Sequence, residues 1–163
     1  MRYRRFARIG YQFIAASAGA LTIWALFAAP LYYVIHAAVH LGDEQEMNVF
    51  ALLTSAGIGF FVGVPLGAAA GVWGARRLLK ERASYRKALL GAVQGMVVGG
   101  LFGGVLILLS NSFGMDWWDQ NTEMAVFPVI PFIVTVIAAV KAGLSNSFRR
   151  GDTIENERGS HGL

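Results

Sequence analysis

The chain has 163 residues, of which 55% are hydrophobic, and carries a net charge of +4 at a mean hydropathy of +0.51. Soluble domains are usually less apolar, with about 45–50% apolar residues, so the composition argues against an ordinary soluble domain. The chain contains no cysteine, which excludes disulfides, thiolate metal sites, iron–sulfur clusters and cysteine nucleophiles.

Four long stretches lack Asp, Glu, Lys and Arg altogether. They are residues 9–42, 47–75, 88–115 and 124–140. A bilayer core about 30 Å thick needs roughly 20 apolar helical residues, and a helix pairs its own backbone polar groups inside hydrocarbon. The fourth stretch reaches this length if Lys141 extends its ammonium group towards the headgroups.

The sequence therefore predicts an all-α polytopic membrane protein with four transmembrane helices. The predicted spans are residues 12–34, 48–74, 88–110 and 124–145. Residues 1–148 form the predicted transmembrane domain, and residues 149–163 form a polar cytoplasmic tail that we expect to be disordered because it is rich in charge and glycine.

The distribution of charge predicts the orientation. All Lys and Arg residues fall within residues 2–8, 76–87 and 141–158, whereas the loops at 43–46 and 116–123 carry only acidic charges. With four spans the three basic segments lie on one side, and the positive-inside rule places that side in the cytoplasm. We therefore expect both termini in the cytoplasm of a cell with a bacterial-type inner membrane, and we expect no nucleic-acid partner.

The first span contains Pro30, which predicts a bend. After it, His36 and His40 lie one turn apart on one helix face, followed by acidic residues. Histidines at this spacing are weak candidates for a metal or haem site. An ordinary polar helix end explains them better, so we predict no metal and no cofactor.

The second and third spans contain the residues considered for a pore. Pro65 lies in the middle of the second span and predicts a bend, and Gln94 is the strongly polar residue of the third. Between these spans, the segment ARRLLKERASYRK is too charged for burial, so we expect a solvated turn. In a self-associated channel, Pro65 and Gln94 would lie near a groove or pore.

Glycine recurs at every fourth position in the second and third spans. The two columns are Gly59, Gly63, Gly67 and Gly71, then Gly91, Gly95, Gly99 and Gly103. They are placed symmetrically about Glu81, and small-xxx-small patterns allow membrane helices to pack closely. The symmetry predicts that the two spans form a hairpin packed along its glycines. The alternatives are packing against the first or fourth span or a partner, and a cleft for a lipid, a quinone or ions.

The hairpin hypothesis predicts which substitutions are tolerated. Gly67→Leu or Gly95→Leu should disrupt folding by overpacking. Ala138→Leu in the fourth span should matter less.

The sequence contains no pattern that indicates catalysis. The cores of the spans have no ionisable residue, which membrane ion and proton pathways usually require, and HExxH, GxSxG and phosphate-loop motifs are absent. We therefore expect a non-enzymatic membrane protein, an accessory, assembly or scaffold subunit of a larger inner-membrane complex. Its expected partners are the lipid bilayer and other membrane subunits or itself. The alternative is a small channel or transporter formed by self-association along the glycine-rich faces.

Overall fold

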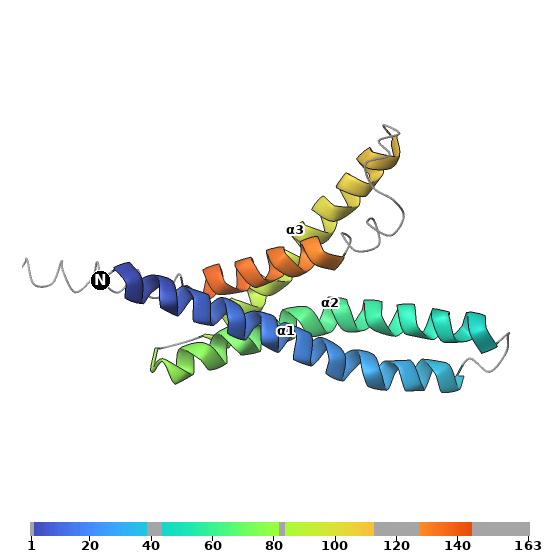
Figure 1. Ribbon diagram of the computed structural model, residues 1–163, viewed down its shortest axis with the longest axis horizontal. Helices are drawn as coiled ribbons and strands as arrows, with labels where there is room; N and C mark the ends of the chain where they lie inside the picture. The colour runs from blue at the N-terminus through green and yellow to red at the C-terminus, as the bar shows by residue number, and fades with distance from the viewer. Residues whose placement is uncertain (1, 39–43, 82–83, 113–127, 145–163) are drawn as a thin grey trace, which may run out of the picture.

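The computed structural model describes residues 2–38, 44–81, 84–112 and 128–144, and the described residues build four helices (Figure 1). Helix α1 spans Arg2–Ala38, α2 spans Glu44–Leu78 and α3 spans Tyr85–Ser112. The fourth helix, Pro128–Leu144, carries no label in the figure. The predicted all-helical fold is confirmed for these residues.

Three of the helices are long and apolar enough to cross a membrane. Their apolar segments are Phe6–Ala37, Val49–Leu78 and Tyr85–Leu106. The described part of the fourth helix is shorter, and at 1.5 Å per residue it extends for about 25 Å. The prediction of helices long and apolar enough to span a membrane is therefore confirmed for three helices, while the fourth, as described, falls short of a bilayer core of about 30 Å.

Helices α1 and α2 form a long antiparallel pair (Figure 1). Their contacts run in register from Ala28 beside Gly59, at one end, to Ala16 beside Gly71, near the other. Both helices continue through a proline, Pro30 in α1 and Pro65 in α2.

Helix α3 pairs with the fourth helix. Pro131 of the fourth helix lies beside Gly99, and Ala142 lies beside Gly91, so the two run antiparallel. Figure 1 shows the C-terminal end of α3 pointing away from α1 and α2. The contact between α2 and α3 is much less extensive than that between α1 and α2.

The two helix pairs meet in a core of small side chains to which all four helices contribute. Seven of its twelve buried residues are alanine, including Ala20, Ala68, Ala92 and Ala139. Short side chains let helix axes approach closely, which is the main source of helix association in lipid.

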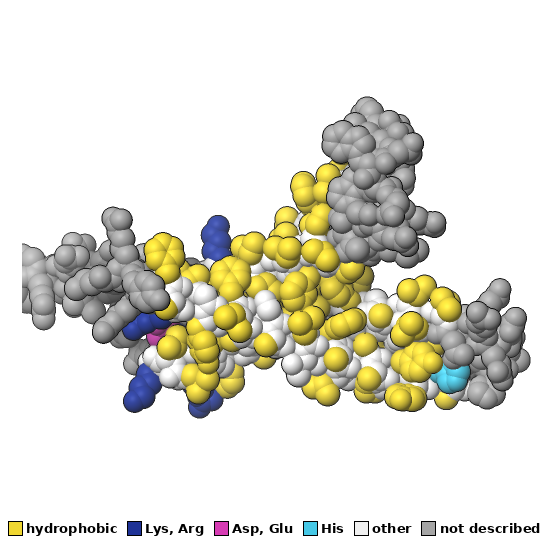
Figure 2. All heavy atoms as spheres, in the orientation of Figure 1, with side chains coloured by type: hydrophobic (Ala, Val, Ile, Leu, Met, Phe, Trp, Pro, Cys, Tyr) yellow, Lys and Arg dark blue, Asp and Glu magenta, His cyan; other side chains and the backbone are white. Residues whose placement is uncertain are grey.

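The outer surfaces of the helices are apolar. The space-filling view shows hydrophobic side chains over most of the visible face (Figure 2). Examples are Phe50 and Leu53 on α2 and Leu101 on α3, all of which are exposed. Exposed apolar side chains on this scale are unfavourable in water and suited to lipid.

Candidate functional site

The interface between α1 and α2 brings the two backbones into contact. A methyl group built on Gly63 would lie 2.7 Å from Cα of Trp24, and one on Gly71 would lie 2.9 Å from Cα of Ala16. Carbon atoms pack at about 3.5–4.0 Å, so neither position leaves space for a side chain.

A reciprocal close approach joins Gly67 of α2 to Gly19 of α1. A methyl group on Gly67 would lie 2.6 Å from the carbonyl carbon of Gly19 and 2.7 Å from Cα of Ala20. Sequence reasoning did not single out Gly19. A signal was present, because residues 15–20 read AASAGA, a run of small residues suited to close helix packing.

The interface between α3 and the fourth helix uses the second glycine column in the same way. Methyl groups built on these glycines would lie 2.7 Å from the Ala138 carbonyl oxygen for Gly91, 2.8 Å from Cα of Thr135 for Gly95, and 2.7 Å from Cα of Pro131 for Gly99. The small or compact residues of the fourth helix let α3 approach it.

The pairing of the two glycine columns differs from the predicted hairpin of the second and third spans. Gly59, Gly63, Gly67 and Gly71 lie against α1, and Gly91, Gly95 and Gly99 lie against the fourth helix. Gly103 has no described atom within 4 Å of a methyl group built on it. The correction has a physical reason: each column needs a facing row of small residues, and α1 and the fourth helix supply one.

This pairing also corrects the expectation for Ala138. Its Cβ would lie 2.7 Å from a methyl group built on Gly95, and its carbonyl oxygen faces Gly91. Ala138 is thus part of the interface, and a leucine there would meet the backbone of α3.

Few polar side chains are buried among the described residues. Gln12, Ser55, Arg76 and Thr135 are buried. Ser55 donates a hydrogen bond to the Leu52 carbonyl at 3.0 Å, whereas Oε1 of Gln12 and Oγ1 of Thr135 have no partner.

A hydrogen bond from Trp24 links α1 to α2 within the apolar segment. Nε1 of Trp24 donates to the Ala56 carbonyl at 3.1 Å. A buried indole N–H usually finds an acceptor, and here a backbone carbonyl of the neighbouring helix provides it.

The C-terminal end of α2 is closed by a Schellman cap. The Glu81 N–H donates to the Arg76 carbonyl at 2.9 Å, and the Lys80 N–H donates to the Arg77 carbonyl at 3.0 Å. Lys80 adopts a φ of 55°, the left-handed conformation that glycine usually supplies in this motif.

An ion pair replaces the hydrophobic contact that often accompanies such a cap. Nε of Arg76 lies 3.2 Å from Oε2 of Glu81, and Nη1 of Arg8, from α1, lies 3.5 Å from Oε1 of the same carboxylate. The Arg76 side chain is only 3% exposed, so the expectation that every charge in this turn is solvated is wrong for Arg76.

The described Lys and Arg side chains gather at one end of the molecule, where Figure 2 shows the basic and acidic side chains together. The contacts of Arg8 and Arg76 with Glu81 join α1 to the end of α2 there. The fourth helix reaches the same end, because a methyl group built on Gly143 would lie 3.9 Å from Nη1 of Arg76.

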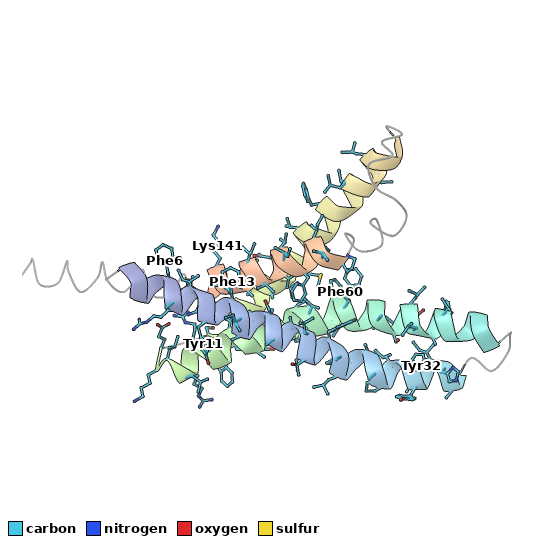
Figure 3. The ribbon with its side chains drawn as sticks, viewed as in Figure 1. Phe6, Tyr11, Phe13, Tyr32, Phe60 and Lys141 are labelled. Atoms are coloured by element: carbon cyan, nitrogen blue, oxygen red, sulfur yellow. The ribbon has the colours of Figure 1, made fainter. Side chains whose placement is uncertain are left out.

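The opposite end carries the histidine considered for metal or haem. His36 stacks on Tyr32, with ring centroids 5.7 Å apart, and its Nδ1 has no partner. Figure 3 labels Tyr32 near this end of α1 and Phe6 near the other. His40 lies outside the described residues, among which no group of three or more His, Asp or Glu could hold a metal ion.

The two residues considered for a groove or pore lie in different surroundings. Pro65 is buried in α2, and Gln94 is exposed on α3.

Comparison with known proteins gave no match: no protein-family model, no curated protein and no solved structure resembles the chain closely enough to be assigned.

Proposed function

We propose that this protein is a non-enzymatic integral membrane protein that acts as an accessory, assembly or scaffold subunit of a larger inner-membrane complex. The observation that carries the proposal is the pair of backbone-to-backbone helix interfaces, at Gly67 with Gly19 and at Gly95 with Thr135. Such interfaces resist the helix sliding that many carriers need, because any displacement brings side chains into the facing backbone.

The apolar exterior supports the same proposal. Exposed leucine, valine and phenylalanine side chains cover α2 and α3, leaving surface for lipid and for neighbouring subunits. Membrane helices associate through packing rather than hydrophobicity, so a partner would need a surface complementary in shape to one of these faces.

In-membrane photocrosslinking tests the proposal. A photoreactive residue is placed at Leu53 or Leu101, which are exposed, and at Val72, which is buried and serves as the control. We expect the exposed positions to form a discrete protein adduct that the control does not form. A monomer in mild detergent, together with no protein adduct from either exposed position, contradicts a scaffold role.

The orientation is part of the proposal, with the basic end in the cytoplasm and both termini on that side. Because the chain contains no cysteine, single cysteines report accessibility directly. In intact spheroplasts, a membrane-impermeant maleimide should label Asp119→Cys, and it should label Lys80→Cys only after lysis. Labelling of Lys80→Cys in intact spheroplasts, with labelling of Asp119→Cys only after lysis, would show that the chain has the opposite orientation.

A channel or transporter formed by self-association is the second candidate. Buried oxygens of Gln12 and Thr135 that have no hydrogen-bond partner favour it, since buried polar atoms without a protein partner are commonly bonded to internal water. Proteoliposomes that carry the purified chain should then pass ions or small solutes. Flux equal to that of empty liposomes contradicts this candidate and leaves the scaffold proposal intact.

A further inference from the structure

We propose that the capped end of α2 binds the phosphate group of acidic phospholipids, through a surface that we call the basic patch, formed by Arg8, Arg77 and Lys80. The patch is independent of the scaffold role, because it concerns the lipid at one membrane surface and not a protein partner. It follows from the charge balance, the exposure and the apolar border of the capped end.

The charge balance at the cap leaves a deficit of negative charge. Glu81 is shared by two guanidinium groups, with Oε2 facing Arg76 and Oε1 facing Arg8. One carboxylate neutralises one of them, and two further cationic residues, Arg77 and Lys80, precede it within four positions along the chain. The Arg76 side chain is almost fully buried, and a buried charge without a counter-charge is strongly unfavourable. The negative charge of Glu81 therefore mainly balances Arg76.

The cationic groups of the basic patch are accessible. The Arg8 side chain is 60% exposed although it reaches Glu81, and Arg77 and Lys80 are also exposed. The cap contributes directly, because the left-handed conformation of Lys80 ends the helix and carries this residue past its last turn. Arginine and lysine with free N–H groups are suited to phosphate oxygens.

The patch borders on exposed apolar and aromatic side chains, which favours a lipid over an acidic protein or a free anion. The guanidinium carbon of Arg77 lies 5.0 Å from the centre of the Trp73 ring, and tryptophan is typical of the membrane–water interface. Leu78 is 74% exposed and Phe6 73% exposed. Figure 3 labels Phe6 and Tyr11 near the same end of α1. A ligand with a phosphate and acyl chains matches both halves of this surface.

Thermal unfolding in nanodiscs of two compositions tests the proposal. The full chain is reconstituted either in phosphatidylcholine alone or with phosphatidylglycerol added, and the quantity compared is the rise in unfolding temperature caused by the acidic lipid. Each variant is compared with itself, so a change in intrinsic stability cancels. Lys141→Gln removes one exposed charge from the fourth helix at the same end and serves as the matched control.

We expect a higher unfolding temperature for the unchanged chain in acidic nanodiscs, and a rise at least twofold smaller for the Arg77→Gln, Lys80→Gln double variant. The Lys141→Gln control should keep most of the rise. Equal rises in unfolding temperature for the unchanged chain and the double variant would overturn the proposal. So would a control in which the rise falls as much as in the double variant, because that result indicates a general attraction between basic residues and the acidic membrane surface rather than a site.

Two further measurements separate the source of the phosphate and the binding itself. Inorganic phosphate added to neutral nanodiscs should not reproduce the rise, and a full reproduction would overturn the choice of a lipid. Native mass spectrometry should detect phosphatidylglycerol retained by the unchanged chain and less by the double variant. Retention that is equal for the two would contradict a site at these residues.

Discussion

A single methyl group at the crossing of Gly67 and Gly19 gives the sharpest test of the fold. Gly67→Ala places a Cβ atom 2.6 Å from the carbonyl carbon of Gly19 and 2.7 Å from Cα of Ala20. Both neighbours are backbone atoms, which cannot move aside by changing a rotamer. Helix α1 must therefore shift as a whole.

The size of the effect follows from two opposing contributions. Ordinary contact between carbon atoms is about 3.5–4.0 Å, so the helices must separate by about 1 Å at this crossing. Overpacking of this kind costs about 1–3 kcal/mol. Replacing glycine by alanine favours the helix by up to about 1 kcal/mol. We expect a net loss of stability of about 1–2 kcal/mol.

Gly74→Ala is the matched control. It lies on the same helix, and among the described residues no atom outside its own helix backbone lies within 4 Å of a methyl group built there. This variant gains helix propensity without a clash, so we expect it to be more stable by about 0.5–1 kcal/mol. The two variants make the same chemical change in the same element, which leaves the crossing as the difference between them.

The free energy of unfolding is measured by titrating the detergent-solubilised protein with sodium dodecyl sulfate and following helical circular dichroism. Gly67→Ala should unfold at a lower fraction of dodecyl sulfate than the unchanged chain, and Gly74→Ala at an equal or higher fraction. If Gly67→Ala is as stable as Gly74→Ala, the backbones do not touch at Gly19 and the described interface is wrong.

Four further substitutions test other features by the same titration. Ala138→Leu should destabilise the chain by about 1–3 kcal/mol because its extra carbons meet the backbone of α3; tolerance equal to that of Gly74→Ala would contradict the second interface. Lys80→Gly should stabilise the chain by about 1 kcal/mol, since glycine adopts a φ of 55° without strain, and a loss of stability would show that the cap depends on the lysine side chain. Glu81→Gln should cost about 1–3 kcal/mol of stability because it leaves Arg76 buried without its counter-charge. Arg8→Gln, at a largely exposed pair, should cost less than about 1 kcal/mol. Similar losses of stability for the two variants would contradict the difference in burial between the two ion pairs.

Much of the helical architecture could be predicted from the sequence, because hydropathy and the absence of charge are local properties. The charge-free stretches locate all four helices, and the fourth differs in its described length. The helices extend beyond the apolar stretches, since polar residues such as those before Phe6 in α1 continue the same helix.

The partners of the glycine columns could not be predicted in the same way. Spacing shows that a column such as Gly59 to Gly71 permits close approach, but several facing rows satisfy that geometry equally well. Symmetry about Glu81 reflects the position of the turn and does not select a partner. The small residues at 15–20 and the alanines of the fourth helix were the more informative signal, because close packing needs small residues on both sides.

The charged cap was missed for a different reason. Charge in a turn predicts solvation on average, whereas the surroundings of Arg76 involve elements distant in sequence: the fourth helix lies beside it at Gly143, and its counter-charge Glu81 also pairs with Arg8 of α1. The cap motif also lacks its usual glycine, so Lys80 offered no sequence signal for a Schellman turn.

The pairing of neighbours along the chain has a consequence for how the protein is made. Each close interface joins two helices that follow one another in synthesis, α1 with α2 and α3 with the fourth helix. Once Glu81 has left the ribosome, the nascent chain contains both packed surfaces of the first pair. It also contains the carboxylate that pairs with Arg8 of α1 and Arg76 of α2. Contacts between segments that are close in sequence form faster than contacts between distant segments, so less apolar surface stays exposed during synthesis. A nascent chain halted in the turn between α2 and α3 would already contain a complete hairpin.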